Sequence, residues 1–79
     1  MYKVYFENRF DERIFLDEAK NEEEIYGIIK NDIAMRAQPS FKWYYTRVRT
    51  TEDGEKIYDV SSHSEFYIAV PVENVEKKN

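Results

Sequence analysis

The residue types that could form a catalytic set lie near position 60. His63, the only histidine, lies between Ser61 and Ser64 and close to Asp59. A serine, a histidine and an aspartate are the members of a nucleophilic triad, but a triad also needs an oxyanion hole and a preorganised pocket. The chain has two glycines and no cysteine, and it contains none of the established phosphate-binding or nucleophile motifs. We therefore interpret the segment as a polar turn and expect no enzyme, no metal site and no cofactor.

Acidic side chains are concentrated between positions 11 and 24. One interpretation is a solvated strand end and helix start. The other is an acidic patch that binds a basic cleft on another protein, in competition with DNA phosphates. The spacing is not that of an EF-hand, so no divalent cation site is expected. The residues are Asp11, Glu12, Asp17, Glu18, Glu22, Glu23 and Glu24.

A second candidate set combines aromatic rings with arginines. Such a combination holds bases, sugars or peptides by stacking and cation–π contact. Arg47 and Arg49 are also suited to holding one phosphate or carboxylate between them. The alternatives are that these aromatic rings belong to the core or to a homodimer interface. The set comprises Trp43, Tyr45, Arg47, Arg49, Tyr58 and Tyr67.

These residues must be positioned by a small α+β fold, for which the sequence predicts the order β-β-α-β-β-β. A single helix on one face of an antiparallel sheet is the expected arrangement, and the last three strands should form a meander. The expected strands cover residues 2–7, 13–18, 41–50, 55–60 and 65–70, and the expected helix covers residues 22–37.

The helix has the clearest local signals. Asn21 is a suitable N-cap, and Glu24 completes a capping-box pattern. Apolar residues at three- and four-residue spacing form one stripe, and Gln38-Pro39 should end the helix. The stripe consists of Ile25, Ile28, Ile29, Ile33 and Ala37.

The dipeptide Asp53-Gly54 sets the expected register of the second hairpin. As a two-residue loop it would place Arg49 opposite Tyr58. The helix would then cover a face carrying Val48 and Ile57, and the aromatic and arginine set would lie on the open face. A bulge near Thr46 would instead return Trp43 to the core.

Two further strands have an expected inward face. In the last strand the residues expected in the core are Phe66, Ile68 and Val70. In the second strand we expect Ile14 and Leu16 to point inward, with Phe15 outside.

Composition limits the functions that are available. The 79 residues suffice for one domain, which we place at 1–72, followed by a frayed tail at 73–79. The net charge of −4 argues against direct nucleic-acid binding, and no apolar run reaches the length of a membrane span. We expect a cytoplasmic protein that binds a protein partner, forms a homodimer, or holds a nucleotide or another small anion.

The segment 58–67, Tyr-Asp-Val-Ser-Ser-His-Ser-Glu-Phe-Tyr, resembles segments of small uncharacterised proteins from bacterial phages and mobile elements. The resemblance covers this segment alone and follows no catalytic motif. It implies a short accessory protein that acts by binding a host-cell component, and it assigns no site residues.

Overall fold

A computed structural model describes residues 1–36, 47–60 and 64–72. The predicted tail at 73–79, Trp43, Tyr45, His63 and the position of the possible bulge near Thr46 lie outside the described residues. The described elements are β1 (Tyr2–Glu7), β2 (Arg13–Ala19), α1 (Glu22–Arg36), β3 (Arg47–Thr50), β4 (Lys56–Asp59) and β5 (Phe66–Pro71).

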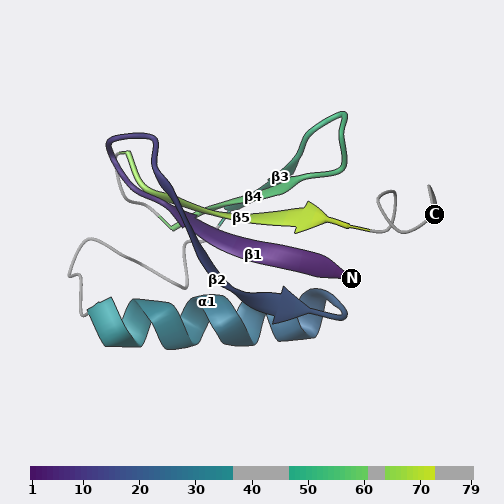
Figure 1. Cartoon of the computed structure of the whole chain (residues 1–79), viewed down its shortest axis with the longest axis horizontal. Helices are drawn as coiled ribbons and strands as arrows, with labels where there is room; N and C mark the ends of the chain where they lie inside the picture. Colours follow the sequence, from purple (N-terminus) through teal and green to yellow (C-terminus); the bar gives the residue numbers. More distant parts are fainter. Residues whose placement is uncertain (37–46, 61–63, 73–79) are drawn as a thin grey trace.

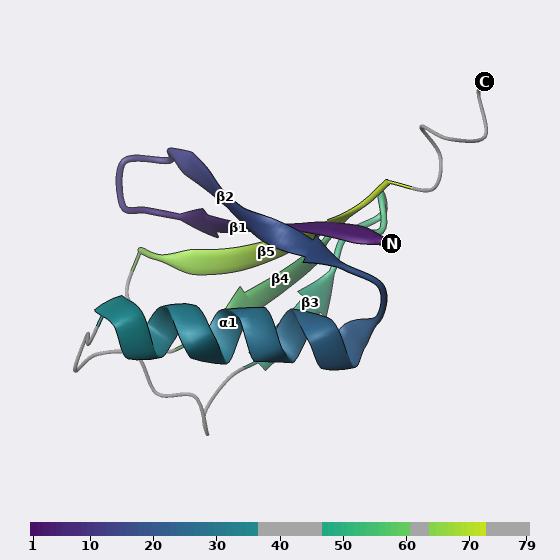
Figure 2. The same ribbon diagram turned by 60° about the horizontal axis from the view of Figure 1, so that its bottom comes forward.

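The strands form one antiparallel sheet in the order β2-β1-β5-β4-β3, with α1 packed on one face (Figures 1 and 2). The predicted fold class, element order and C-terminal meander are confirmed. The first and last strands pair at the centre of the sheet, so β2 and β3 are its two edges. The loops of the β1–β2 and β3–β4 hairpins both rise on the side away from α1 (Figure 1). We call that side the open face.

The start of α1 follows the predicted capping pattern. The Asn21 side chain accepts a hydrogen bond from the Glu24 amide at 3.0 Å, and the Glu24 carboxylate accepts one from the Lys20 amide at 2.8 Å. The first bond satisfies an amide that the helix itself leaves without a partner, and the second holds the amide of Lys20, the residue before the cap. Ile25 and Ile29 of the predicted stripe are fully buried, while Ile28 and Ile33 pack against the core from its margin.

The predicted register of the second hairpin is wrong by one residue. Val48 lies opposite Tyr58 and Arg49 opposite Ile57, and the loop between Thr51 and Glu55 has three residues. Gly54 takes the left-handed conformation at the end of that loop, with φ of 86°. Because side chains alternate between the faces of a sheet, a shift of one residue exchanges the two faces.

The helix therefore covers the face opposite to the expected one. Tyr58 and Tyr67 are cross-strand neighbours and are both 0% exposed beneath α1. Ile57 and Ile68 lie on the open face, where Ile68 is still only 2% exposed. Phe66 and Val70 share that open face and are half-buried, so they are not the core residues that the alternation predicted. The core cluster comprises Val4, Phe6, Ala19, Ile25, Ile29, Tyr58, Val60, Tyr67 and Ala69.

The second strand contains an irregularity that changes which residues point inward. Its register with β1 shifts between Val4 and Tyr5, so that Phe15 and Asp17 oppose consecutive residues of β1. Leu16 packs against the core as expected, whereas Ile14 is 44% exposed. A bulge of this kind bends and twists the bulged strand.

Candidate functional site

The predicted aromatic and arginine set does not form one surface. Tyr58 and Tyr67 lie beneath α1, whereas Arg47 and Arg49 lie on the open face. Trp43 and Tyr45 lie outside the described residues. The two arginines line a hollow of about 380 Å³ with Val48, Ile57, Asp59 and Phe66. Of the predicted set, only the arginine pair is therefore shown to be accessible.

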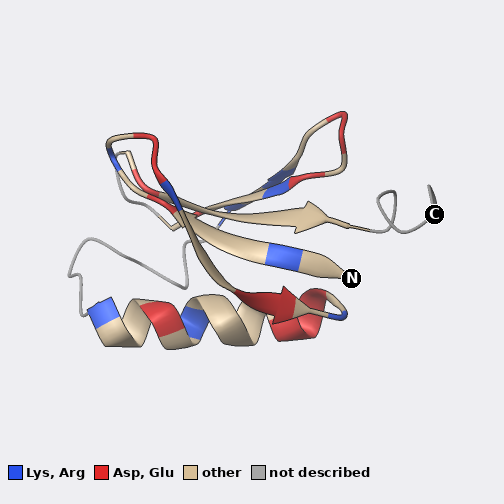
Figure 3. Ribbon diagram, in the orientation of Figure 1, with Lys and Arg blue, Asp and Glu red and all other residues tan. Residues whose placement is uncertain are grey.

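The predicted acidic patch divides into two groups (Figure 3). Asp11 and Glu12 lie in the loop of the β1–β2 hairpin, and we call them the hairpin-tip pair. The end of β2 and the first turn of α1 lie side by side at the other end of the hairpin and carry the remaining carboxylates. These are Asp17, Glu18, Glu22, Glu23 and Glu24.

Two adjoining hollows between β2 and α1 form a continuous groove beside this second group. Their volumes are about 340 and 240 Å³, and they share Asp17, Ile28 and Asn31 as lining residues. We call this the acidic groove. Its lining residues are Phe15, Leu16, Asp17, Glu18, Glu24, Gly27, Ile28, Asn31, Asp32 and Met35.

The acidic groove combines apolar surface with negative charge. Phe15 is 52% exposed and Met35 is 74% exposed, so both can be covered further by a partner. Within the described residues, Asp17, Glu18 and Glu24 form no ion pair, whereas Lys56 approaches the neighbouring Glu22 at 3.3 Å. The groove therefore carries carboxylates whose charge no described side chain neutralises.

Gly27 lies in the lining of the groove, in the middle of α1. A Cβ at this position would meet no atom within 4 Å, so no close packing requires a glycine. Glycine inside a helix costs about 1 kcal/mol relative to alanine. Because glycine has no side chain, it leaves open space on the helix side of the groove, although it lowers the stability of the helix.

The edge of β2 is closed to strand addition at Glu18. The Asp17 carboxylate accepts a hydrogen bond from the Glu18 amide at 2.8 Å, and the β2 bulge lies immediately before it. Charged side chains and bulges are common means of preventing edge-to-edge pairing.

Asp32 closes one end of the groove and links it to the core. Its carboxylate accepts hydrogen bonds from the Tyr67 hydroxyl at 2.6 Å and from Arg36 Nε. The Arg36 guanidinium carbon lies 3.8 Å from the centroid of the Phe6 ring, in a cation–π contact. Burial raises the pKa of Tyr67, and the hydrogen bond to Asp32 raises it further. Asp32 is therefore held by Arg36 and Tyr67 and forms a fixed end of the groove.

Tyr58 has a different environment from Tyr67. Its ring meets Tyr26 edge-on at 5.7 Å between centroids, and burial raises the pKa of its hydroxyl. In the part of the chain that the structure describes, this buried hydroxyl has no hydrogen-bond partner. Tyr58 is therefore a core residue with an unsatisfied polar atom.

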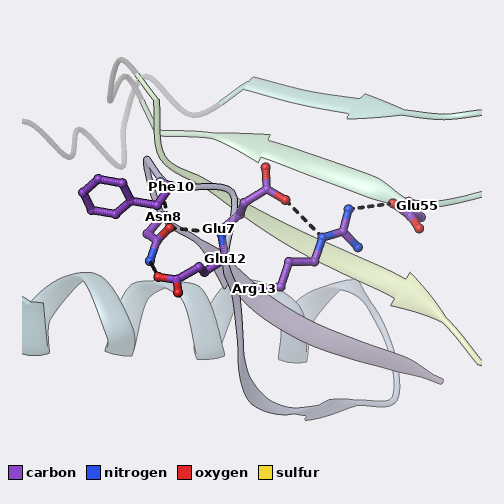
Figure 4. A network of polar contacts seen from close by, with 6 residues as sticks. All are labelled: Glu7, Asn8, Phe10, Glu12, Arg13 and Glu55. Atoms are coloured by element: carbon purple, nitrogen blue, oxygen red, sulfur yellow. Dashed lines mark hydrogen bonds and ion pairs between the residues drawn. The ribbon is translucent and has the colours of Figure 1, made fainter.

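A network of charges crosses the open face (Figure 4). Arg13 Nε lies 3.0 Å from Glu7, and another nitrogen of the same guanidinium lies 3.6 Å from Glu55. Arg13 and Glu7 belong to the first hairpin, and Glu55 closes the turn of the second. The network therefore joins the two hairpins on the side away from α1.

Other kinds of site find no support in the described residues. Within residues 1–36, 47–60 and 64–72, no group of three or more histidine, cysteine or acidic side chains is placed to hold a metal ion. No helix in these ranges has the length and apolar character needed to cross a bilayer. Comparisons with protein families, with curated proteins and with solved structures find no match.

Sequence reasoning missed the apolar half of the acidic groove. Asn31 and Met35 lie along α1 beside Ile28 of the predicted stripe, and all three line the groove. The available signals were Met35, an apolar residue outside the predicted stripe, and Gly27 inside a helix. Asp32 gave no signal of its contact with Tyr67, because Tyr67 belongs to a strand that is distant in the sequence.

Proposed function

We propose that this chain is a non-enzymatic binding protein whose acidic groove receives a basic segment of a partner protein. The observation that carries the proposal is the continuous groove between β2 and α1, in which exposed apolar side chains lie beside unneutralised carboxylates. Apolar contact supplies affinity, while charge complementarity selects the partner and speeds association.

The proposed occupant is a segment with lysine or arginine next to a large apolar side chain. The basic groups would lie near Asp17 and Glu24, and the apolar group would lie against Phe15 and Met35. Two copies of this chain would not pair groove to groove, because two acidic grooves repel each other. Nucleic acid is a poor occupant for the same reason.

The resemblance to phage proteins suggests where such a partner occurs. A host protein that normally binds nucleic-acid phosphates presents the basic surface that the acidic groove would complement. Occupying that surface would inhibit the host protein. This biological role is part of the proposal and depends on the resemblance.

The proposal is tested with a synthetic peptide of alternating lysine and leucine. Its affinity is measured by isothermal titration calorimetry and compared with peptides in which glutamate replaces lysine or serine replaces leucine. The lysine–leucine peptide should bind tightest, because only it supplies both charge and apolar area. Equal affinity of all three peptides, or no binding by any, would contradict the proposal.

A matched pair of double variants locates the contact. Asp17→Asn with Glu24→Gln removes two charges from the groove but keeps both side-chain acceptors. Asp11→Asn with Glu12→Gln makes the same change at the hairpin-tip pair. The groove variant should weaken peptide binding about tenfold, as expected for removing close charge pairs. The hairpin-tip variant should change it less than about twofold, because exposed charges at a distance are screened by salt.

Gly27→Gln provides a test that separates binding from stability. Glutamine favours helix and should raise the free energy of unfolding by about 0.5–1 kcal/mol. The same side chain would project into the groove and obstruct the peptide. A variant that is more stable and also binds with unchanged affinity would show that the groove is not the contact surface.

A further inference from the structure

The hollow around Arg47 and Arg49 lies apart from the acidic groove, beside the opposite edge of the sheet. Arg47, Asp59 and Phe66 are cross-strand neighbours in β3, β4 and β5, and Arg49 lies opposite Ile57 in the next row. These residues share the open face, with β3 at the edge of the sheet. The hollow of about 380 Å³ has the volume of a small-molecule site.

The two guanidinium groups are placed to act together. Alternate residues of a strand point the same way and lie roughly 7 Å apart. Both side chains are exposed, and no hydrogen bond or ion pair engages either of them in the described part of the chain. Two arginines at this spacing can donate to one oxyanion from two sides.

The remaining lining residues restrict the kind of anion. Ile57 and Phe66 are half-buried and supply apolar surface to the hollow. Among the described lining residues, the Asp59 carboxylate offsets one of the two arginine charges and leaves one net positive charge. A single oxyanion on an apolar body suits this lining better than a polyanion such as a nucleic-acid strand.

We propose that this hollow binds a small organic phosphate whose single oxyanion lies between Arg47 and Arg49 and whose flat apolar group lies against Ile57 and Phe66. A nucleoside monophosphate and a simple aryl phosphate share this chemistry. The site is independent of the acidic groove, because the two linings have no residue in common.

The test is a titration of the ¹⁵N-labelled protein with phenyl phosphate, inorganic phosphate and phenol, followed by backbone amide NMR. Phenyl phosphate should bind at least about tenfold more tightly than either fragment and should shift the amides of Arg47, Arg49 and Phe66. Adenosine monophosphate is the additional arm. If adenosine monophosphate binds more tightly than phenyl phosphate, the site is assigned to nucleotides. If it binds equally or more weakly, the site is assigned to simpler aryl phosphates.

Substitutions then identify the groups responsible. Arg47→Gln and Arg49→Gln should each weaken phenyl phosphate binding about tenfold, the value expected for a charge-assisted hydrogen bond. Arg9→Gln, in the loop of the first hairpin, removes the same charge from an exposed site and should leave the affinity unchanged. Thermal unfolding checks that all three variants fold. Equal weakening in all three, or phenyl phosphate binding no tighter than inorganic phosphate, would overturn the proposal.

Discussion

The two hairpins of this sheet form the same kind of turn, but they lie at opposite edges of the sheet. In each loop the first residue donates from its amide to the carbonyl of the last, at 3.0 Å for Asn8 and Glu12 and 2.9 Å for Thr51 and Glu55. In each, a side-chain oxygen of the first residue also accepts from the amide of the last. The left-handed position is held by Asp11 in one hairpin and by Gly54 in the other.

The edges differ in charge and in what covers them. The β2 edge lies beside α1 and carries the acidic groove, whereas the β3 edge carries two arginines over a hollow on the open face. The two hairpins therefore repeat one backbone geometry, while the side chains at the two edges differ in charge.

The largest expected effect is a loss of stability at alkaline pH. Burial raises the pKa of Tyr58 and of Tyr67 above the ordinary value of about 10. The folded state then keeps protons that the unfolded state releases, so the stability they confer is complete below about pH 10. Above about pH 10 it declines by about 1.4 kcal/mol per pH unit for each tyrosine, and it is fully lost once the pH has passed the folded pKa values. Urea unfolding between pH 9 and 11.5 measures the decline, and each Tyr→Phe variant should reduce its slope.

Next in size is a contrast between the two tyrosines at neutral pH. Tyr67→Phe removes the hydroxyl donor to Asp32, which then keeps only its bond from Arg36, and should lower the free energy of unfolding by about 2 kcal/mol. Tyr58→Phe removes a buried hydroxyl that has no described partner and should be neutral or stabilising by up to about 1 kcal/mol. Chemical denaturation of both variants measures the difference. Equal losses would mean that Tyr58 has a partner of comparable strength.

The two turns should respond in opposite directions. Gly54→Ala introduces a side chain at φ of 86°, with its Cβ 3.4 Å from Pro71, and should cost about 1–2 kcal/mol. Asp11→Gly relieves a left-handed aspartate and should stabilise by up to about 1 kcal/mol. Thermal melts of the two variants are sufficient to compare them. Destabilisation by Asp11→Gly would show that the Asp11 side chain contributes more than its backbone conformation costs.

The smallest expected effect concerns the connection between the hairpins. Arg13→Gln breaks the contacts with Glu7 and Glu55, which are partly exposed, and should cost less than about 1 kcal/mol. The loss should shrink further in 1 M salt because exposed charges are screened. A larger, salt-independent loss would indicate that the Arg13 side chain contributes mainly by packing.

The sequence predicted the elements better than the faces they present. The order of elements and the cap at Asn21 follow from local signals, and both are confirmed. The register of the second hairpin does not follow from Asp53-Gly54, because the same dipeptide fits the last two positions of a three-residue loop. The hydrogen bond from the Glu55 amide to Thr51 accompanies the longer loop, and that one-residue difference placed Tyr58 in the core.

The candidate sites depended on contacts between distant segments. Asp17 and Glu24 were predicted as acidic residues, but only the packing of β2 beside α1 places them along one groove with Met35. Arg47 and Arg49 were predicted as a pair, while their neighbours Ile57 and Phe66 were assigned to the core. Local sequence patterns cannot identify the cross-strand neighbours of a residue when the register between the strands is unknown.

The most direct test of the acidic groove is an NMR map of the lysine–leucine peptide on the ¹⁵N-labelled protein. The amides of Leu16, Gly27 and Asn31 should shift on titration, while those of Arg47 and Arg49 should not. Shifts confined to β3, or spread evenly over the protein at peptide excess, would contradict the assignment of the groove as the partner site.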